Sequence, residues 1–102
     1  MKTVSLIGAP TDVGASVRGA GMGPDALRVA GLVDVLRANG LQVIDRGNLA
    51  GPPNPWAPAD AGLRHLDEVV AWNRAVFGAV AEVLAADQTP LLMGGDHCLA
   101  IG

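Results

Sequence analysis

The sequence has a single cysteine, few basic residues and no long apolar run, and each shortage excludes a class of protein. Cys98 cannot form an internal disulfide, which is typical of proteins from a reducing compartment. Without spaced partners, the pair His97-Cys98 does not make a structural zinc site, which needs four ligands. Seven basic residues are scattered against ten acidic ones, so the net charge of −3 predicts neither a nucleic-acid groove nor an anionic membrane partner. The first apolar run is interrupted by Gly8 and Pro10, too early for a signal peptide, and no run reaches the roughly 20 residues that span a bilayer.

The chain is short and unusually apolar. Its 102 residues suit one domain, half of them are hydrophobic, 17% are charged, and the mean hydropathy is +0.35. A domain of this size leaves much of its surface exposed. We therefore expect part of its apolar surface to contact neighbours outside this sequence.

Short apolar runs and turn residues divide the chain into alternating strands and helices. Runs without polar alternation predict buried strands of a parallel sheet at residues 4–8, 41–45 and 91–93. Pro24 is placed to open a helix, Gly31 interrupts it, and Asn39-Gly40 ends it. The order of strands and helices predicts an α/β fold with right-handed crossovers.

A long helix is expected from Asp60 or Leu63 to Ala86, after an irregular proline-rich segment at residues 51–62. Residues spaced by three and four predict one buried helix face. This face comprises Leu66, Val69, Val70, Asn73, Val76, Phe77, Val80, Val83 and Leu84. His65 is expected on the solvent side of the same helix.

Three segments should meet at the carboxyl edge of the sheet, where parallel sheets bind ligands. They are residues 8–23, Asp45-Arg46, and Gly94 to His97. The last segment leaves two interpretations open. Asp96 can cap a following helix, and His97 can bind a metal ion, since imidazole and carboxylate are both common metal ligands. Cys98 is interpreted as a packing residue.

The glycine-rich segment at residues 14–23 also needs weighing as a dinucleotide-binding turn. Its glycines follow the first strand by more than ten residues, whereas a phosphate-binding turn follows its strand directly. The spacing therefore disfavours this function. Arg18 and Arg28 can contact an anion, but for both a structural salt bridge is the simpler interpretation.

Four segments together resemble the ureohydrolases, the arginase and agmatinase family, and the arginase branch in particular. They are IGAPTDVG, VRGAGMGPDALRVAGL, LQVIDRGNL and PLLMGGDHCLAIG. The resemblance implies a three-layer α/β/α parallel-sheet domain, of which residues 1–102 are an incomplete N-terminal segment. The GGDH motif is common to arginases and agmatinases, so it identifies the superfamily and not the substrate.

By that resemblance, His97 is the first histidine ligand of a two-manganese centre, and Asp96 supports ligand orientation or caps the next helix. The implied reaction is hydrolysis of the guanidinium group of L-arginine to L-ornithine and urea by a metal-bridging hydroxide. No catalytic or substrate-binding residue is assigned in this chain. The family usually has Ser after the histidine, where this chain has Cys98.

The resemblance also implies a small guanidino substrate, no nucleic-acid or membrane partner, a cytoplasmic location and assembly as a homo-oligomer, a trimer or hexamer. We expect the isolated 102-residue chain to be inactive, because one histidine cannot hold two metal ions. Alternative functions are an agmatinase or another guanidino hydrolase, and, from a different class, a non-catalytic ligand-binding α/β module or a truncated remnant.

Overall fold

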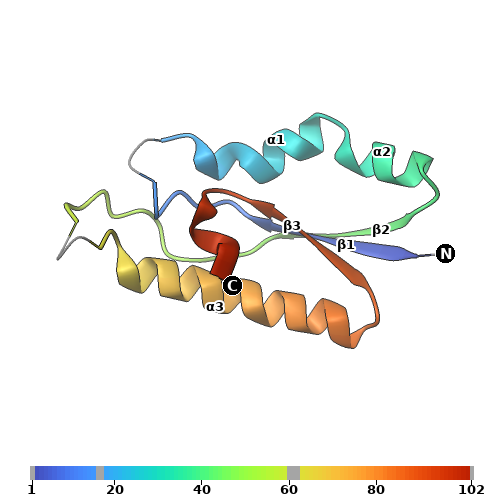
Figure 1. The fold of residues 1–102 in the computed structure, drawn as a ribbon. Helices are drawn as coiled ribbons and strands as arrows, with labels where there is room; N and C mark the ends of the chain where they lie inside the picture. Colours follow the sequence, from blue (N-terminus) through green and yellow to red (C-terminus); the bar gives the residue numbers. More distant parts are fainter. Residues whose placement is uncertain (1, 16–17, 60–62, 102) are drawn as a thin grey trace.

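A computed structural model describes residues 2–15, 18–59 and 63–101 of the chain (Figure 1). The elements follow in the order β1 (Thr3–Ala9), η1 (Ala20–Met22), α1 (Gly23–Val29), α2 (Leu32–Ala38), β2 (Gln42–Asn48), α3 (Leu66–Ala85), β3 (Thr89–Gly94) and η2 (His97–Ile101). None of the described helices is long and apolar enough to cross a membrane.

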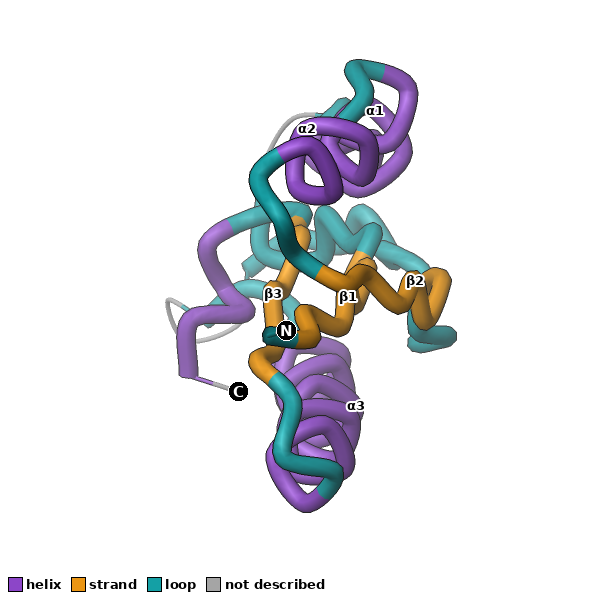
Figure 2. Tube along the Cα trace, turned by 90° about the vertical axis from the view of Figure 1, so that its right-hand side faces the viewer, coloured by secondary structure: helices purple, strands orange, loops and turns teal. Residues whose placement is uncertain are grey.

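The described strands form a parallel sheet in the order β2-β1-β3. Helices α1 and α2 lie on one face of this sheet and α3 lies on the other, which gives three layers (Figures 1 and 2). The predicted α/β architecture is therefore confirmed.

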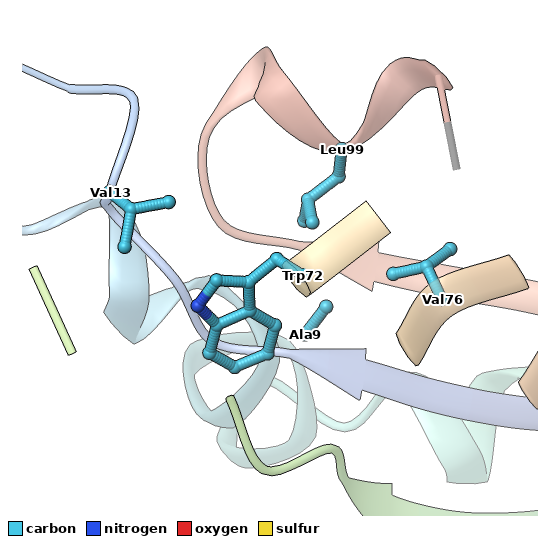
Figure 3. Close-up of a cluster of buried hydrophobic side chains, with 5 residues drawn as sticks. All are labelled: Ala9, Val13, Trp72, Val76 and Leu99. Carbon is cyan, nitrogen blue, oxygen red and sulfur yellow. The ribbon is translucent and has the colours of Figure 1, made fainter. Parts of the chain in front are cut away.

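The central strand β1 is buried from Val4 to Ala9, because helices cover both of its faces. Its side chains alternate between two cores. The core toward α1 and α2 contains Val4, Leu6, Val43 and Met93. The core toward α3 contains Ala9, Val13, Trp72, Val76 and Leu99 (Figure 3). A strand buried on both faces has no reason to alternate polar with apolar residues, which explains its continuous apolar sequence.

Strand β2 is longer than predicted, and this corrects the expected place of Asp45-Arg46. Asp45 pairs with Leu6 inside the strand, and Asn48, paired with Gly8, stands at its carboxyl end. The register shifts between these two pairs, and Gly47 adopts a φ of 76° there. Such an irregularity adds residues to a strand without changing its apolar pattern, so the composition of LQVID did not reveal it.

The long helix also differs from its prediction, both in its start and in its buried face. Helix α3 begins at Leu66, after His65 in a left-handed conformation with a φ of 51°. Its buried residues are Trp72, Val76 and Val83, whereas Leu66, Phe77 and Leu84 are exposed. Each of these two sets of residues forms a stripe along the helix. At 100° per residue, the exposed stripe lies about a quarter of a turn from the buried one, and both stripes show the spacing of a helix. Periodicity alone did not distinguish them.

The break in the first helix occurs as predicted. Gly31 separates α1 from α2 with a φ of 95°, a left-handed conformation that glycine adopts without a steric penalty.

Candidate functional site

The candidate site lies at the carboxyl edge of the sheet, where the chain leaves β1 and β3. Two backbone hydrogen bonds join these ends: Gly95 N–H donates to Ala9 O at 3.2 Å, and Asp96 N–H donates to Thr11 O at 3.0 Å. A Cβ atom on Gly95 would collide with the Thr11 backbone. Glycine at position 95 therefore allows the two strand ends to approach.

The same steric requirement explains a second glycine. A Cβ atom on Gly23, at the start of α1, would collide with the carbonyl oxygen of Gly94. The glycine-rich segment thus packs closely against the end of β3, and this packing accounts for Gly23 without a bound phosphate.

Asp96 links the turn after β3 to the loop after β1. Its Oδ2 accepts a hydrogen bond from Gly14 N–H at 2.9 Å, and its Oδ1 accepts one from Cys98 N–H at 2.7 Å. The second bond caps the start of η2. A Cβ on Gly14 would come within 2.9 Å of Asp96 Oδ1, so this loop also approaches because glycine is present. The Asp96 carboxylate is thereby fixed in one orientation.

The residues after His97 are anchored to α3. Leu99 extends into the core beside Trp72 and Val76 (Figure 3). Asn73, on the same helix, donates a hydrogen bond from Nδ2 to the carbonyl oxygen of Cys98 at 2.8 Å. Cys98 is half-buried, and its burial, together with the Asp96 carboxylate, raises the pKa of its thiol to about 12. The thiol is therefore neutral and packed at physiological pH.

His97 itself is exposed at the first position of η2. Two cavities of about 440 and 290 Å³ lie elsewhere on the described surface, and His97 lines neither. Among the described residues no group of three His, Cys, Asp or Glu side chains is arranged to hold a metal ion. The described part of this edge therefore offers one exposed imidazole, while the neighbouring Asp96 carboxylate is occupied by backbone N–H groups.

His65, expected on the solvent side of the long helix, is buried with only 8% of its surface exposed. Its Nδ1 lies 2.6 Å from Val13 O, and its Nε2 accepts a hydrogen bond from Ala57 N–H at 3.1 Å. With a proton on Nδ1, the ring donates to Val13 O, and Nε2 also lies 3.1 Å from the carbonyl oxygen of Ala57. The prediction was wrong because α3 begins only at Leu66, so His65 precedes the helix and its ring contacts two loops.

Arg28 forms the structural ion pair that its sequence context predicted. Its Nε and Nη2 donate to the Asp45 carboxylate at 2.9 and 3.0 Å. Nη1 reaches Asp25 Oδ1 at 3.0 Å and Asn48 Oδ1 at 2.6 Å. The Arg28 contacts lower the pKa of Asp45. This cluster fastens α1 to β2.

Among the described residues, the contact of Arg18 is with an aromatic ring and not with the carboxylate that a salt bridge requires. Its guanidinium carbon lies 4.6 Å from the centroid of the Trp56 ring. This cation–π contact connects the glycine-rich loop to the proline-rich segment.

Two further site residues, Gly14 and Asn73, were not recognised from the sequence as partners of the turn. Their contacts join segments far apart in the chain, for which no local signal exists.

The chain as a whole matches a known family. The family model described as the arginase family matches residues 2–102. The chain belongs to the arginase family. It is 38% identical over 102 residues to an arginase from Brevibacillus brevis and 40% identical over 102 residues to one from Bacillus subtilis strain 168. Each alignment covers 99% of this chain and 34% of the relative.

Solved arginase structures agree with this assignment. The native arginase of Bacillus caldovelox superposes with a TM-score of 0.86 at 35% identity, covering 98% of this chain and 34% of that one. A 1.7 Å structure of the Bacillus subtilis arginase gives a TM-score of 0.82 at 37% identity, covering 97% and 32%. The chain thus spans about a third of the length of the arginases it matches.

Proposed function

We propose that residues 1–102 form the N-terminal part of a manganese-dependent arginase that hydrolyses L-arginine to L-ornithine and urea. The observation that carries this proposal is the position of His97. Its imidazole is exposed after the carboxyl end of β3, on a turn whose other residues are hydrogen-bonded to the loop after β1 and to α3. The family match over residues 2–102 supports the choice of reaction.

In this proposal His97 is one metal ligand and Asp96 keeps the ligand turn in place. Manganese suits a site of imidazole and carboxylate ligands, and when bound it supplies Lewis-acid activation of water at neutral pH. The guanidinium carbon is resonance-stabilised and a poor electrophile, so its hydrolysis requires such activation. The Asp96 carboxylate already accepts two N–H bonds, and its part is therefore to orient the turn.

The proposal extends to assembly and location. Leu66, Phe77 and Leu84 form an exposed apolar stripe on α3, which supports burial against further protein, including other subunits of a trimer or hexamer. A single half-buried thiol supports a reducing compartment such as the cytoplasm.

A hybrid enzyme tests the proposal. Residues 2–102 replace the matching N-terminal third of the Bacillus subtilis arginase, to which they are 40% identical. We expect the hybrid to release urea from arginine, to lose this activity after chelation, and to regain it with Mn²⁺. The unaltered Bacillus subtilis enzyme and the isolated 102-residue chain serve as positive and negative controls. A folded hybrid that neither binds Mn²⁺ nor releases urea would contradict the proposal.

A further inference from the structure

Asn73 is a half-buried polar residue on α3 in an energetically unfavourable position. Its Nδ2 donates to Val69 O at 2.9 Å and to Cys98 O at 2.8 Å. Its Oδ1 is buried, and the described residues offer it no hydrogen-bond partner. A buried acceptor without a partner is unfavourable, and Asn is a weaker helix former than Leu. Helix stability therefore does not explain this side chain.

A second asparagine shows which of the two bonds of Asn73 is distinctive. Asn39, at the end of α2, donates from Nδ2 to Val35 O at 2.8 Å, the same bond to the fourth preceding carbonyl. Asn39 is exposed, and within the described part of the chain its side chain has no hydrogen bond to another element. What Asn73 has in addition is the bond to the carbonyl oxygen of Cys98, the residue that follows His97.

This bond completes a set of contacts on both sides of His97. Before it, Asp96 is bonded to Gly14. After it, the Cys98 carbonyl is bonded to Asn73, and Leu99 packs in the core toward α3 (Figure 3). The His97 side chain between these contacts is exposed.

We propose that Asn73 is a positioning residue for His97, which fixes the backbone of the turn so that the imidazole is presented to a divalent metal ion. The proposal rests on the proposed function of His97 as a ligand. Asn73 acts through the Cys98 carbonyl and does not itself contact the metal. Partners that orient a ligand typically change metal affinity about 10- to 100-fold when removed.

The test variant is Asn73→Leu, because leucine has the same branched shape and lacks both the donor and the unpaired acceptor. Asn39→Leu is the matched control, since it loses the equivalent intrahelical bond alone. The first measurement is amide hydrogen exchange of Cys98 and Leu99 in the full 102-residue chain. The second is Mn²⁺ affinity of the hybrid enzyme, measured from the electron paramagnetic resonance signal of free Mn²⁺.

We expect Asn73→Leu to speed exchange of the two amides by about tenfold or more and to weaken Mn²⁺ binding about 10- to 100-fold, with unfolding stability little changed. Asn39→Leu should leave both measurements unchanged. Unaltered exchange in Asn73→Leu overturns the proposal, and so does faster exchange with unaltered Mn²⁺ affinity. If the unsubstituted hybrid binds no Mn²⁺, the proposed function is rejected. The hydrogen-exchange data on the 102-residue chain then still measure whether Asn73 anchors the turn.

Discussion

The two histidines of this chain occupy opposite environments. His65 is buried at the start of α3, and its ring nitrogens contact the backbone of Val13 and Ala57. His97 is exposed at the start of η2, and the hydrogen bonds of its turn are made by its neighbours Asp96 and Cys98. The His65 ring uses both of its nitrogens in contacts that join two loops. The other is exposed on a turn that its neighbours anchor, and under the proposed function it binds a metal ion.

Under the proposed function, a histidine is available for metal binding where the residues around it leave a ring nitrogen unbonded. A ring with both nitrogens bonded to backbone has no lone pair to offer, whereas an exposed neutral ring has one. The difference gives four predictions.

The largest effect is expected from His97→Ala. In the hybrid enzyme this change should lower Mn²⁺ affinity and arginine turnover by about 100-fold or more, because it removes a ligand itself. Stability should hardly change, since the side chain is exposed. Metal content after dialysis and steady-state urea release measure the effect. Full metal content in the variant would exclude His97 as a ligand.

Asp96→Ala should have the next largest effect, because it frees the N–H groups of Gly14 and Cys98 and loosens the turn. We expect Mn²⁺ affinity to fall about 10- to 100-fold and stability to fall by about 1 kcal/mol, the usual value of a helix cap. Calorimetric titration and chemical denaturation measure the two. Asp34→Ala, on the exposed side of α2, is the control and should change neither.

His65→Ala should reverse the pattern of His97→Ala. It leaves Val13 O and Ala57 N–H without their partner, which should lower the free energy of unfolding by about 1–3 kcal/mol. Mn²⁺ affinity of the folded hybrid should not change. Urea denaturation compares the variant with His97→Ala, the same substitution at the exposed site. Equal stabilities of the two variants would mean that the His65 contacts contribute nothing.

The sequence was sufficient for the fold because the fold depends on local and periodic signals. Continuous apolar runs indicated the three parallel strands, and Gly31 indicated the break between α1 and α2. It was insufficient for His65, because the start of α3 is set by a left-handed residue that no local pattern marks. It also missed Trp72, since two apolar stripes on α3 have helical spacing and only tertiary packing selects between them.

The candidate site was predictable to a similar extent. The GGDH motif pointed to Asp96 and His97, and the order of elements pointed to the carboxyl edge of the sheet. The contacts of Asp96 with Gly14 and of Asn73 with Cys98 join residues 82 and 25 positions apart. Such pairs arise from the packing of β1 against β3 and of α3 against the turn, so they follow only once the three-dimensional structure is known.

The smallest effect is expected at the ion pair between Arg28 and Asp45. Its effect on stability can be compared with that of the buried His65 contacts, because the pair lies at the surface. Arg28 lowers the pKa of Asp45 in the folded state, so the unfolded chain binds that proton at higher pH. The stabilisation is therefore present above the ordinary Asp pKa of about 3.9 and is lost as pH falls through the lower folded value. Asp45→Asn should cost less than about 1 kcal/mol near pH 7, because the pair is partly exposed, and the difference should vanish at strongly acidic pH. Denaturation at several pH values measures the difference in stability between the variant and the unaltered chain. A protonated Asp45 carboxylate has no charge to contribute to the ion pair. A difference that grew on acidification would therefore refute the stabilising role of the pair.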